Sequence, residues 1–153
     1  MRVAIGSDDR SALTDAVRDA LRERGHELIA FGAIEDAAQP WPRVGHLVGQ
    51  AVASGLADTG VVMCWTATGV SMAANKVQGV RAALCGDAQT AAGARRWNDA
   101  NVLALSMRAT SIPVALEILD AWFATSASED PNDRAAIDDV EGARASREPR
   151  GLP

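Results

Sequence analysis

The stretch that decides the fold is TGVVMCWTATGVS, residues 59–71. Its first part, TGVVMC, carries no charge and is rich in β-branched residues, which predicts a strand buried on both faces. The rest forms a short loop around Gly69 and leads into a segment, residues 70–76, that we expect to be a short helix. A buried strand that passes through such a loop into a helix is the repeating unit of a parallel α/β sheet.

The same alternation continues on both sides of this stretch. Expected strands cover residues 3–5, 26–31, 59–64, 80–84 and 102–106. Expected helices cover the stretch before Gly25, where Leu13, Ala16, Val17, Ala20 and Leu21 share one face, and residues 44–54, 70–76, 87–97 and 112–124. This order predicts an α/β fold: a Rossmann-like, doubly wound sheet of five parallel strands with helices on both faces.

Two segments fall outside this alternation. Residues 32–42, which end in Pro40-Trp41-Pro42, predict a surface loop that borders the site, with Trp41 either at the site or a packing anchor. After the expected domain of residues 1–125, residues 126–140 predict a C-terminal arm with a short helix over 133–140. Residues 141–153 are polar, and we expect a disordered tail there.

Composition limits the classes of function. The chain has 153 residues, 48% of them hydrophobic, which fits one well-buried domain. A formal net charge of −5 with scattered basic residues argues against nucleic-acid binding. No apolar run is long enough to span a membrane and charges interrupt the N-terminus at once, so we expect a cytoplasmic protein that does not bind membranes.

The chemistry should lie where the winding of the sheet reverses, beyond the carboxyl ends of the strands. If the first and third strands are neighbours, the loop at Asp8 and Asp9 faces the loop that starts at Cys64. The positive end of the helix that follows would stabilise an anion there and would favour the thiolate form of Cys64. From these residues alone, a buried structural cysteine is the favoured interpretation of Cys64.

Three segments carry a resemblance to a known family: SMAANK at residues 71–76, GVRAALC at 79–85 and NDANVLA at 98–104. With them, the chain from Met1 to about Ala124 resembles the type B ribose 5-phosphate isomerases and the related galactose 6-phosphate isomerase subunits. The resemblance implies interconversion of an aldose and a ketose phosphate through a cis-enediolate, without a metal or organic cofactor. It also implies homodimers, or tetramers built from two such dimers, with sites between the subunits.

The resemblance further implies roles for individual residues. Cys64 would be the base, and Thr66 would bind substrate oxygens. The backbone around Ala67, Thr68, Gly69, Val70 and Ser71 would stabilise the enediolate, and Asp8, Asn98, Arg108 and Arg134 would contact the sugar or its phosphate. Asn75, Lys76 and Asn98 have a structural alternative, because such residues commonly cap helices, and a lone arginine such as Arg108 is often only solvated or ion-paired.

The chain departs from the family pattern at several positions. Asp9 and Trp97 stand where the family usually has histidines, and both are candidates for contact with the substrate. The two histidines present, His26 and His46, are expected to be structural. Since the histidine before Asn98 is associated with opening a furanose ring, a tetrose 4-phosphate that forms no such ring is one alternative substrate. Trp97 would then stack against a short open chain.

Two more departures bear on the shape and charge of the ligand. Trp65 and Ala67 replace loop glycines, and the arm around Arg134 is mostly acidic. An unphosphorylated sugar as substrate, or a non-catalytic sugar-binding role, is therefore also compatible with the sequence. Trp65 and Trp97 would be either sugar platforms or anchors of a subunit interface.

Overall fold

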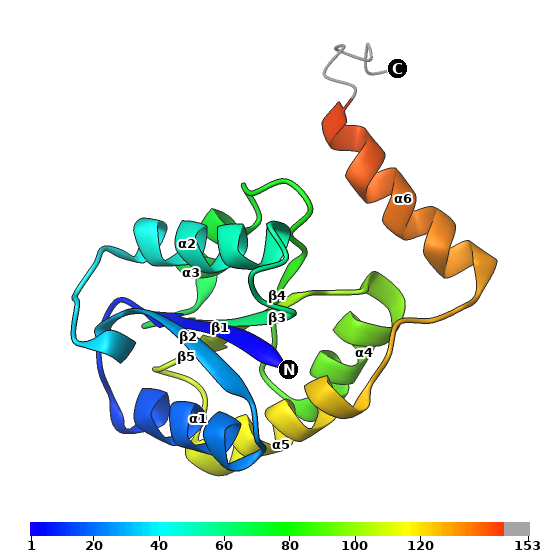
Figure 1. The fold of residues 1–153 in the computed structure, drawn as a ribbon. Helices are drawn as coiled ribbons and strands as arrows, with labels where there is room; N and C mark the ends of the chain where they lie inside the picture. Colours follow the sequence, from blue (N-terminus) through cyan, green and yellow to red (C-terminus); the bar gives the residue numbers. More distant parts are fainter. Residues whose placement is uncertain (146–153) are drawn as a thin grey trace.

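The computed structural model describes residues 1–145, which form a parallel sheet with helices on both faces and one helix that extends from the body (Figure 1). The strands are β1 (Arg2–Ser7), β2 (Glu27–Gly32), β3 (Thr59–Cys64), β4 (Ala82–Leu84) and β5 (Val102–Ser106). The helices are α1 (Ala12–Glu23), α2 (Trp41–Ala53), α3 (Thr68–Ala74), α4 (Ala88–Asn98), α5 (Ile112–Ala124) and α6 (Pro131–Ala145), with a short 3-10 helix, η1, at Ala33–Glu35. The predicted α/β fold with five parallel strands is therefore confirmed.

The strand order is β2-β1-β3-β5-β4, and all neighbouring pairs are parallel. The winding reverses between β1 and β3, which pair directly with Ser7 opposite Met63. The loops that follow β1 and β3 therefore leave the sheet side by side, as the sequence predicted for neighbouring first and third strands.

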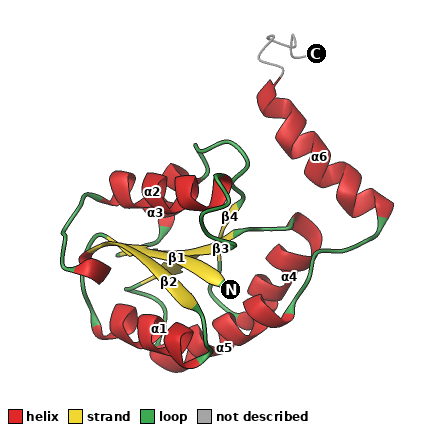
Figure 2. Ribbon diagram, viewed as in Figure 1, coloured by secondary structure: helices red, strands yellow, loops and turns green. Residues whose placement is uncertain are grey.

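Two apolar layers enclose the sheet. Helices α2 and α3 cover one face, and α1, α4 and α5 cover the other (Figure 2). On the second face, the indole Nε1 of Trp122 donates a hydrogen bond of 3.2 Å to Oγ1 of Thr59, which fastens α5 to the start of β3. His26 stacks on Phe123 with ring centroids 4.3 Å apart, which supports the structural role expected for this histidine.

The boundaries of several elements differ from the sequence prediction. Helix α2 starts at Trp41 rather than at residue 44, because Pro42 occupies the first turn, where a missing N–H costs nothing. The expected loop is thus shorter, and Trp41 belongs to a helix. Strand β4 is confined to Ala82–Leu84. Asn75 binds both the N–H and the carbonyl of Ala82, at 2.9 and 2.8 Å. The structural alternative for Asn75 is therefore supported.

Helix α6 stands apart from the body (Figure 1). It begins close to α4, where the Ser128 N–H donates to the Arg96 carbonyl, and Arg81 reaches it through a 2.7 Å ion pair with Glu141. The helix continues to Ala145, past the predicted arm boundary at residue 140. The remainder of the predicted tail, residues 146–153, lies outside the described residues.

Candidate active site

A cavity of about 400 Å³ lies at the carboxyl ends of β1 and β3. Its lining residues come from the β1 loop, the start of α2 and the segment after β3: Asp8, Trp41, Cys64, Trp65, Thr66, Thr68, Gly69 and Met72. Of the site residues predicted from the sequence, Asp8, Cys64, Thr66, Thr68 and Gly69 therefore line one cavity. This is the position at which an open parallel sheet binds ligands.

Cys64 is the last residue of β3 and is 5% exposed. Its carbonyl accepts hydrogen bonds from the N–H groups of Ala67 and Met107, at 3.3 and 3.0 Å. These bonds hold the end of β3 against the end of β5 and leave the thiol at the wall of the cavity. Cys85, the other free cysteine, is also buried, and burial raises the pKa of its thiol to about 11.

The loop after Cys64 turns sharply before α3. Ala67 is fully buried and takes a left-handed conformation with φ of 62°, which explains why the family usually has glycine at this position. Next to it, the hydroxyl groups of Thr66 and Thr68 lie 2.7 Å apart and share a hydrogen bond. Two adjacent hydroxyls at a cavity wall suit a ligand that is rich in hydroxyl oxygens.

Fewer backbone N–H groups are available to a ligand than the predicted stretch of residues 67–71 contains. The Ala67 N–H binds the Cys64 carbonyl, and the Ser71 N–H binds the Ala67 carbonyl within the first turn of α3. By helix geometry, the N–H groups of Thr68, Gly69 and Val70 have no acceptor inside the helix. The side chain of Val70 is fully buried, so only the backbone of this residue is available to a ligand.

Trp41 is a cavity residue whose role the sequence left open. Its ring is 43% exposed and packs over Gly69. Together with Trp65 and Met72, both 62% exposed, it gives the cavity an apolar rim. The Pro40-Trp41-Pro42 motif marks the start of α2, the helix that follows β2 and η1, and this signal would have placed Trp41 beyond the carboxyl end of β2.

Asp8 and Asp9 behave differently although they are neighbours. The Asp8 Oδ1 atom is buried and finds no hydrogen-bond partner among the described residues, and burial raises the pKa of this carboxyl group. The Asp9 side chain is exposed, accepts the N–H of Arg10 at 2.8 Å and does not belong to the cavity lining. Its predicted contact with substrate therefore has no support within this subunit.

Arg108 lies at the same edge of the sheet as Cys64. Its N–H donates a 2.9 Å hydrogen bond to the Trp65 carbonyl, which also accepts the hydroxyl of Ser106 at 2.9 Å. The Arg108 side chain is exposed. The backbone of this arginine therefore fixes the loop that carries Trp65, while its guanidinium group extends toward solvent.

Trp97 and Asn98 lie at the end of the sheet opposite to the end that carries Cys64. They end helix α4, beside the start of β4, where Arg81 binds the carbonyl and carboxylate of Asp99 at 2.9 Å each. A groove of about 290 Å³ separates them from α6. Both side chains are exposed, and neither lines the cavity that contains Cys64.

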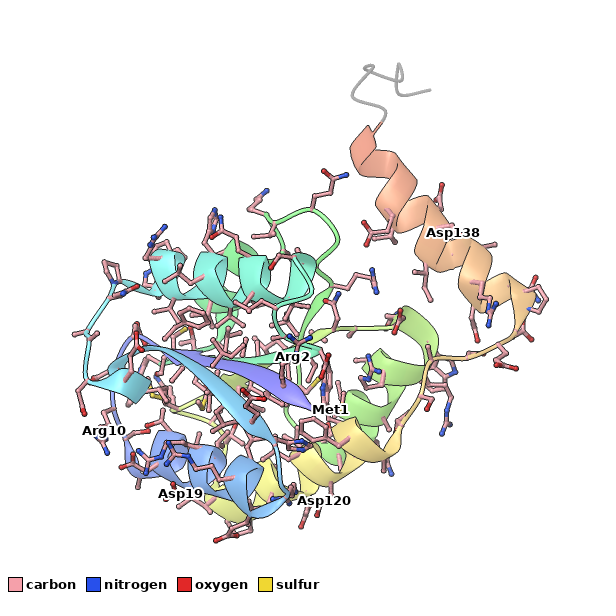
Figure 3. The ribbon with its side chains drawn as sticks, in the orientation of Figure 1. Met1, Arg2, Arg10, Asp19, Asp120 and Asp138 are labelled. Carbon is pink, nitrogen blue, oxygen red and sulfur yellow. The ribbon has the colours of Figure 1, made fainter. Side chains whose placement is uncertain are left out.

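Arg134 shares this remote position. It is exposed on α6, which leaves the body at the edge where α4 ends. Figure 3 shows the separation: Arg10, two residues after Asp8, and Asp138 of α6 lie at opposite ends of the molecule. The predicted site residues thus fall into two groups that lie apart in the single chain.

Two further structural observations concern partners and ligands. None of the helices in the described part of the chain is long and apolar enough to cross a membrane. Within the same residues, no three histidine, cysteine, aspartate or glutamate side chains are grouped as metal ligands would be.

Comparison with known proteins supports the resemblance seen in the sequence. The chain matches the Ribose/Galactose Isomerase family over residues 3–140. It is 40% identical over 102 residues to ribose-5-phosphate isomerase B of Escherichia coli, covering 67% of this chain and 68% of that protein. It is 33% identical over 124 residues to D-erythrulose-4-phosphate isomerase of Pectobacterium atrosepticum, covering 80% and 82% of the two chains.

The fold leads to the same family. The structure superimposes on ribose-5-phosphate isomerase B of Clostridium thermocellum with a TM-score of 0.88 and 36% identity, covering 95% of this chain and 98% of that one. The family model spans nearly all of the described residues. The chain therefore belongs to the ribose/galactose isomerase family.

Proposed function

We propose that this protein interconverts an aldose and a ketose form of a small sugar phosphate, of the ribose 5-phosphate and ribulose 5-phosphate type. The observation that carries the proposal is the placement of the Cys64 thiol in one cavity with the Thr66 and Thr68 hydroxyls, at the reversal of the sheet. The similarity to ribose-5-phosphate isomerase B of E. coli supports the same class of substrate.

In the proposed mechanism, Cys64 acts as a thiolate base. It removes a proton from C1 of the ketose or C2 of the aldose, and the electron pair forms a cis-enediolate. The N–H groups of Thr68, Gly69 and Val70 stabilise the developing negative charge, since they have no acceptor within α3. Thr66 binds a substrate hydroxyl. The protonated Cys64 returns its proton to the neighbouring carbon, so that no metal or organic cofactor takes part.

We propose that two subunits complete each site. Trp97, Asn98 and Arg134 lie at the edge of the sheet remote from Cys64, so they reach a substrate only in the site of a second copy. Apolar side chains are exposed in both regions: Trp41, Trp65 and Met72 around the cavity, and Trp97 and Val140 beside the groove. A symmetric dimer that joins these two regions would form two equivalent sites and cover both sets.

A tetrose 4-phosphate is the second candidate substrate. Trp97 stands where a ring-opening histidine is usual, and neither His26 nor His46 lines the cavity. Indole does not titrate and cannot replace that histidine in proton transfer. The 33% identity to D-erythrulose-4-phosphate isomerase, over 80% of this chain, also favours a substrate that stays open-chain.

Hydrogen exchange in heavy water distinguishes these candidates. Incorporation of deuterium at C1 and C2, followed by NMR, should be compared for ribose 5-phosphate, erythrulose 4-phosphate and unphosphorylated pentoses. Exchange with ribose 5-phosphate supports the first proposal, and exchange with the tetrose phosphate alone supports the second. A folded protein that catalyses exchange with none of these sugars contradicts both. We place the reaction in the cytoplasm, where Cys64 and Cys85 would both stay reduced.

A further inference from the structure

The Asp8 carboxyl group faces the same reaction space as the Cys64 thiol. Strands β1 and β3 pair with Ser7 opposite Met63, so Asp8 and Cys64 are the next residues along the two neighbouring strands. Both line the cavity of about 400 Å³. A ligand atom held against the thiol therefore lies within the region that the carboxyl group borders.

Among the described residues that line the cavity, only Asp8 and Cys64 carry a carboxyl or thiol group that can bind and release a proton. The others are threonine, tryptophan, methionine and glycine. The interconversion needs two kinds of proton transfer, one between the carbons and one between the oxygens O1 and O2. Cys64 supplies the first in the proposed mechanism, which leaves one titratable group for the second.

The surroundings of Asp8 suit this second task. Its Oδ1 atom is buried without a hydrogen-bond partner in the described part of the chain, whereas the neighbouring Asp9 carboxylate is exposed and accepts a backbone N–H. Burial is the main cause that raises the pKa of Asp8, and the negative charge of Asp9 adds to it. The backbone N–H groups of Asp8 and Asp9 act in the opposite direction. The carboxyl group thus accepts a proton more readily than a free aspartate.

We propose that Asp8 carries the proton between O1 and O2 of the enediolate. This role rests on the proposed isomerase function and adds a catalytic residue to it. In the ketose, Cys64 takes the proton from C1, the C1–H electron pair forms the C1=C2 bond, and the carbonyl electron pair moves to O2. The Asp8 carboxylate takes the proton of the O1 hydroxyl and gives it to O2, which leaves the negative charge on O1.

The second half of the step restores both groups. The O1 electron pair forms the C1 carbonyl, and the C1=C2 pair takes the proton from the Cys64 thiol at C2. Asp8 is again a carboxylate and Cys64 is again a thiolate, so atoms and electrons balance without a co-reactant. Without the oxygen-to-oxygen transfer, the enediolate formed from the ketose can only return to the ketose.

The test compares hydrogen exchange with conversion in the Asp8→Asn variant. The substrate is the ketose phosphate that wild-type protein converts fastest, either ribulose 5-phosphate or erythrulose 4-phosphate, in heavy water. Asparagine keeps the shape of the side chain but cannot carry the proton. We expect conversion to the aldose to fall by about 100-fold or more, while exchange at C1 falls far less. The ratio of exchange to conversion should therefore rise by about tenfold or more.

Glu35→Gln provides the matched control. Glu35 is an exposed carboxylate in η1, after β2, and lies outside the cavity lining. This variant should keep the wild-type ratio. If Asp8→Asn, shown to be folded by circular dichroism, loses exchange and conversion in equal proportion, Asp8 only positions the substrate and the inference is wrong. If wild-type protein itself catalyses neither process, the proposed function fails instead.

Discussion

The indole ring of Trp41 lies directly over Gly69. A Cβ atom built on Gly69 would come within 2.8 Å of Cε3 of that ring, closer than side chains approach one another. Helix α2 thereby fixes the first turn of α3, whose N–H groups line the candidate site. This contact between Trp41 and residue 69 requires a glycine, which has no side chain.

We therefore expect Gly69→Ala to push Trp41 and the first turn of α3 apart. A displacement of about 1 Å at a positioning element typically costs about 100-fold in activity, so kcat/KM should fall by about 10- to 100-fold. The double variant with Trp41→Leu should recover part of this loss, because the smaller side chain removes the clash. Steady-state kinetics of wild type, the two single variants and the double variant would reveal this coupling. If the two changes in kcat/KM simply add, the contact between Trp41 and Gly69 does not matter for activity.

Cys64→Ala should abolish turnover while the fold is retained. Loss of the base should lower kcat by about 10²- to 10⁴-fold, and the melting temperature should change little because alanine fits the buried end of β3. Cys85→Ala is the control, since burial raises the pKa of that thiol to about 11 and it lies outside the cavity. Appreciable turnover by Cys64→Ala would identify another base.

The sequence predicted the sheet correctly because buried strands such as TGVVMC differ sharply from amphipathic helices such as the one that contains Leu13 and Val17. It also predicted the cluster at the β1 and β3 loops, since strand ends of a parallel sheet meet at one edge. It did not reveal that Trp97 and Asn98 lie at the other edge. The spacing of motifs along the sequence does not say at which end of the sheet a residue lies. Trp97 and Asn98 are separated from Cys64 because α4 runs back along the sheet.

Mixed dimers test the division of the site between subunits. We expect Cys64→Ala and Asn98→Ala to be inactive or weak alone. After the two proteins are mixed and allowed to exchange subunits, half of the dimers are hybrids, and each hybrid has one site with both residues intact. Activity should recover to about a quarter of wild type. Mixtures that remain as inactive as their components would show that Asn98 acts within its own chain or does not act at all.

Asp8→Asn should stabilise the folded protein at neutral pH, whatever it does to activity. Burial raises the pKa of Asp8 in the folded state above the ordinary value of 3.8, so the folded state holds its proton more tightly than the unfolded chain. As pH rises from below 3.8, the unfolded chain loses this proton first, and wild-type stability declines until the folded carboxyl group is also ionised. Above that pH the penalty is constant.

Asparagine cannot ionise and escapes this penalty. The melting temperature of Asp8→Asn should therefore exceed that of wild type at pH 7, and the difference should shrink as the pH falls towards 3.8 and below. Asp87→Asn is a control with the opposite sign. Asp87 caps α4 and its carboxylate accepts the Thr90 N–H at 2.7 Å, which lowers the pKa of that group in the folded state, so the uncharged variant should lose stability at pH 7. A lower melting temperature for Asp8→Asn at pH 7 would mean that the backbone N–H groups outweigh burial at this carboxylate and that folding lowers its pKa.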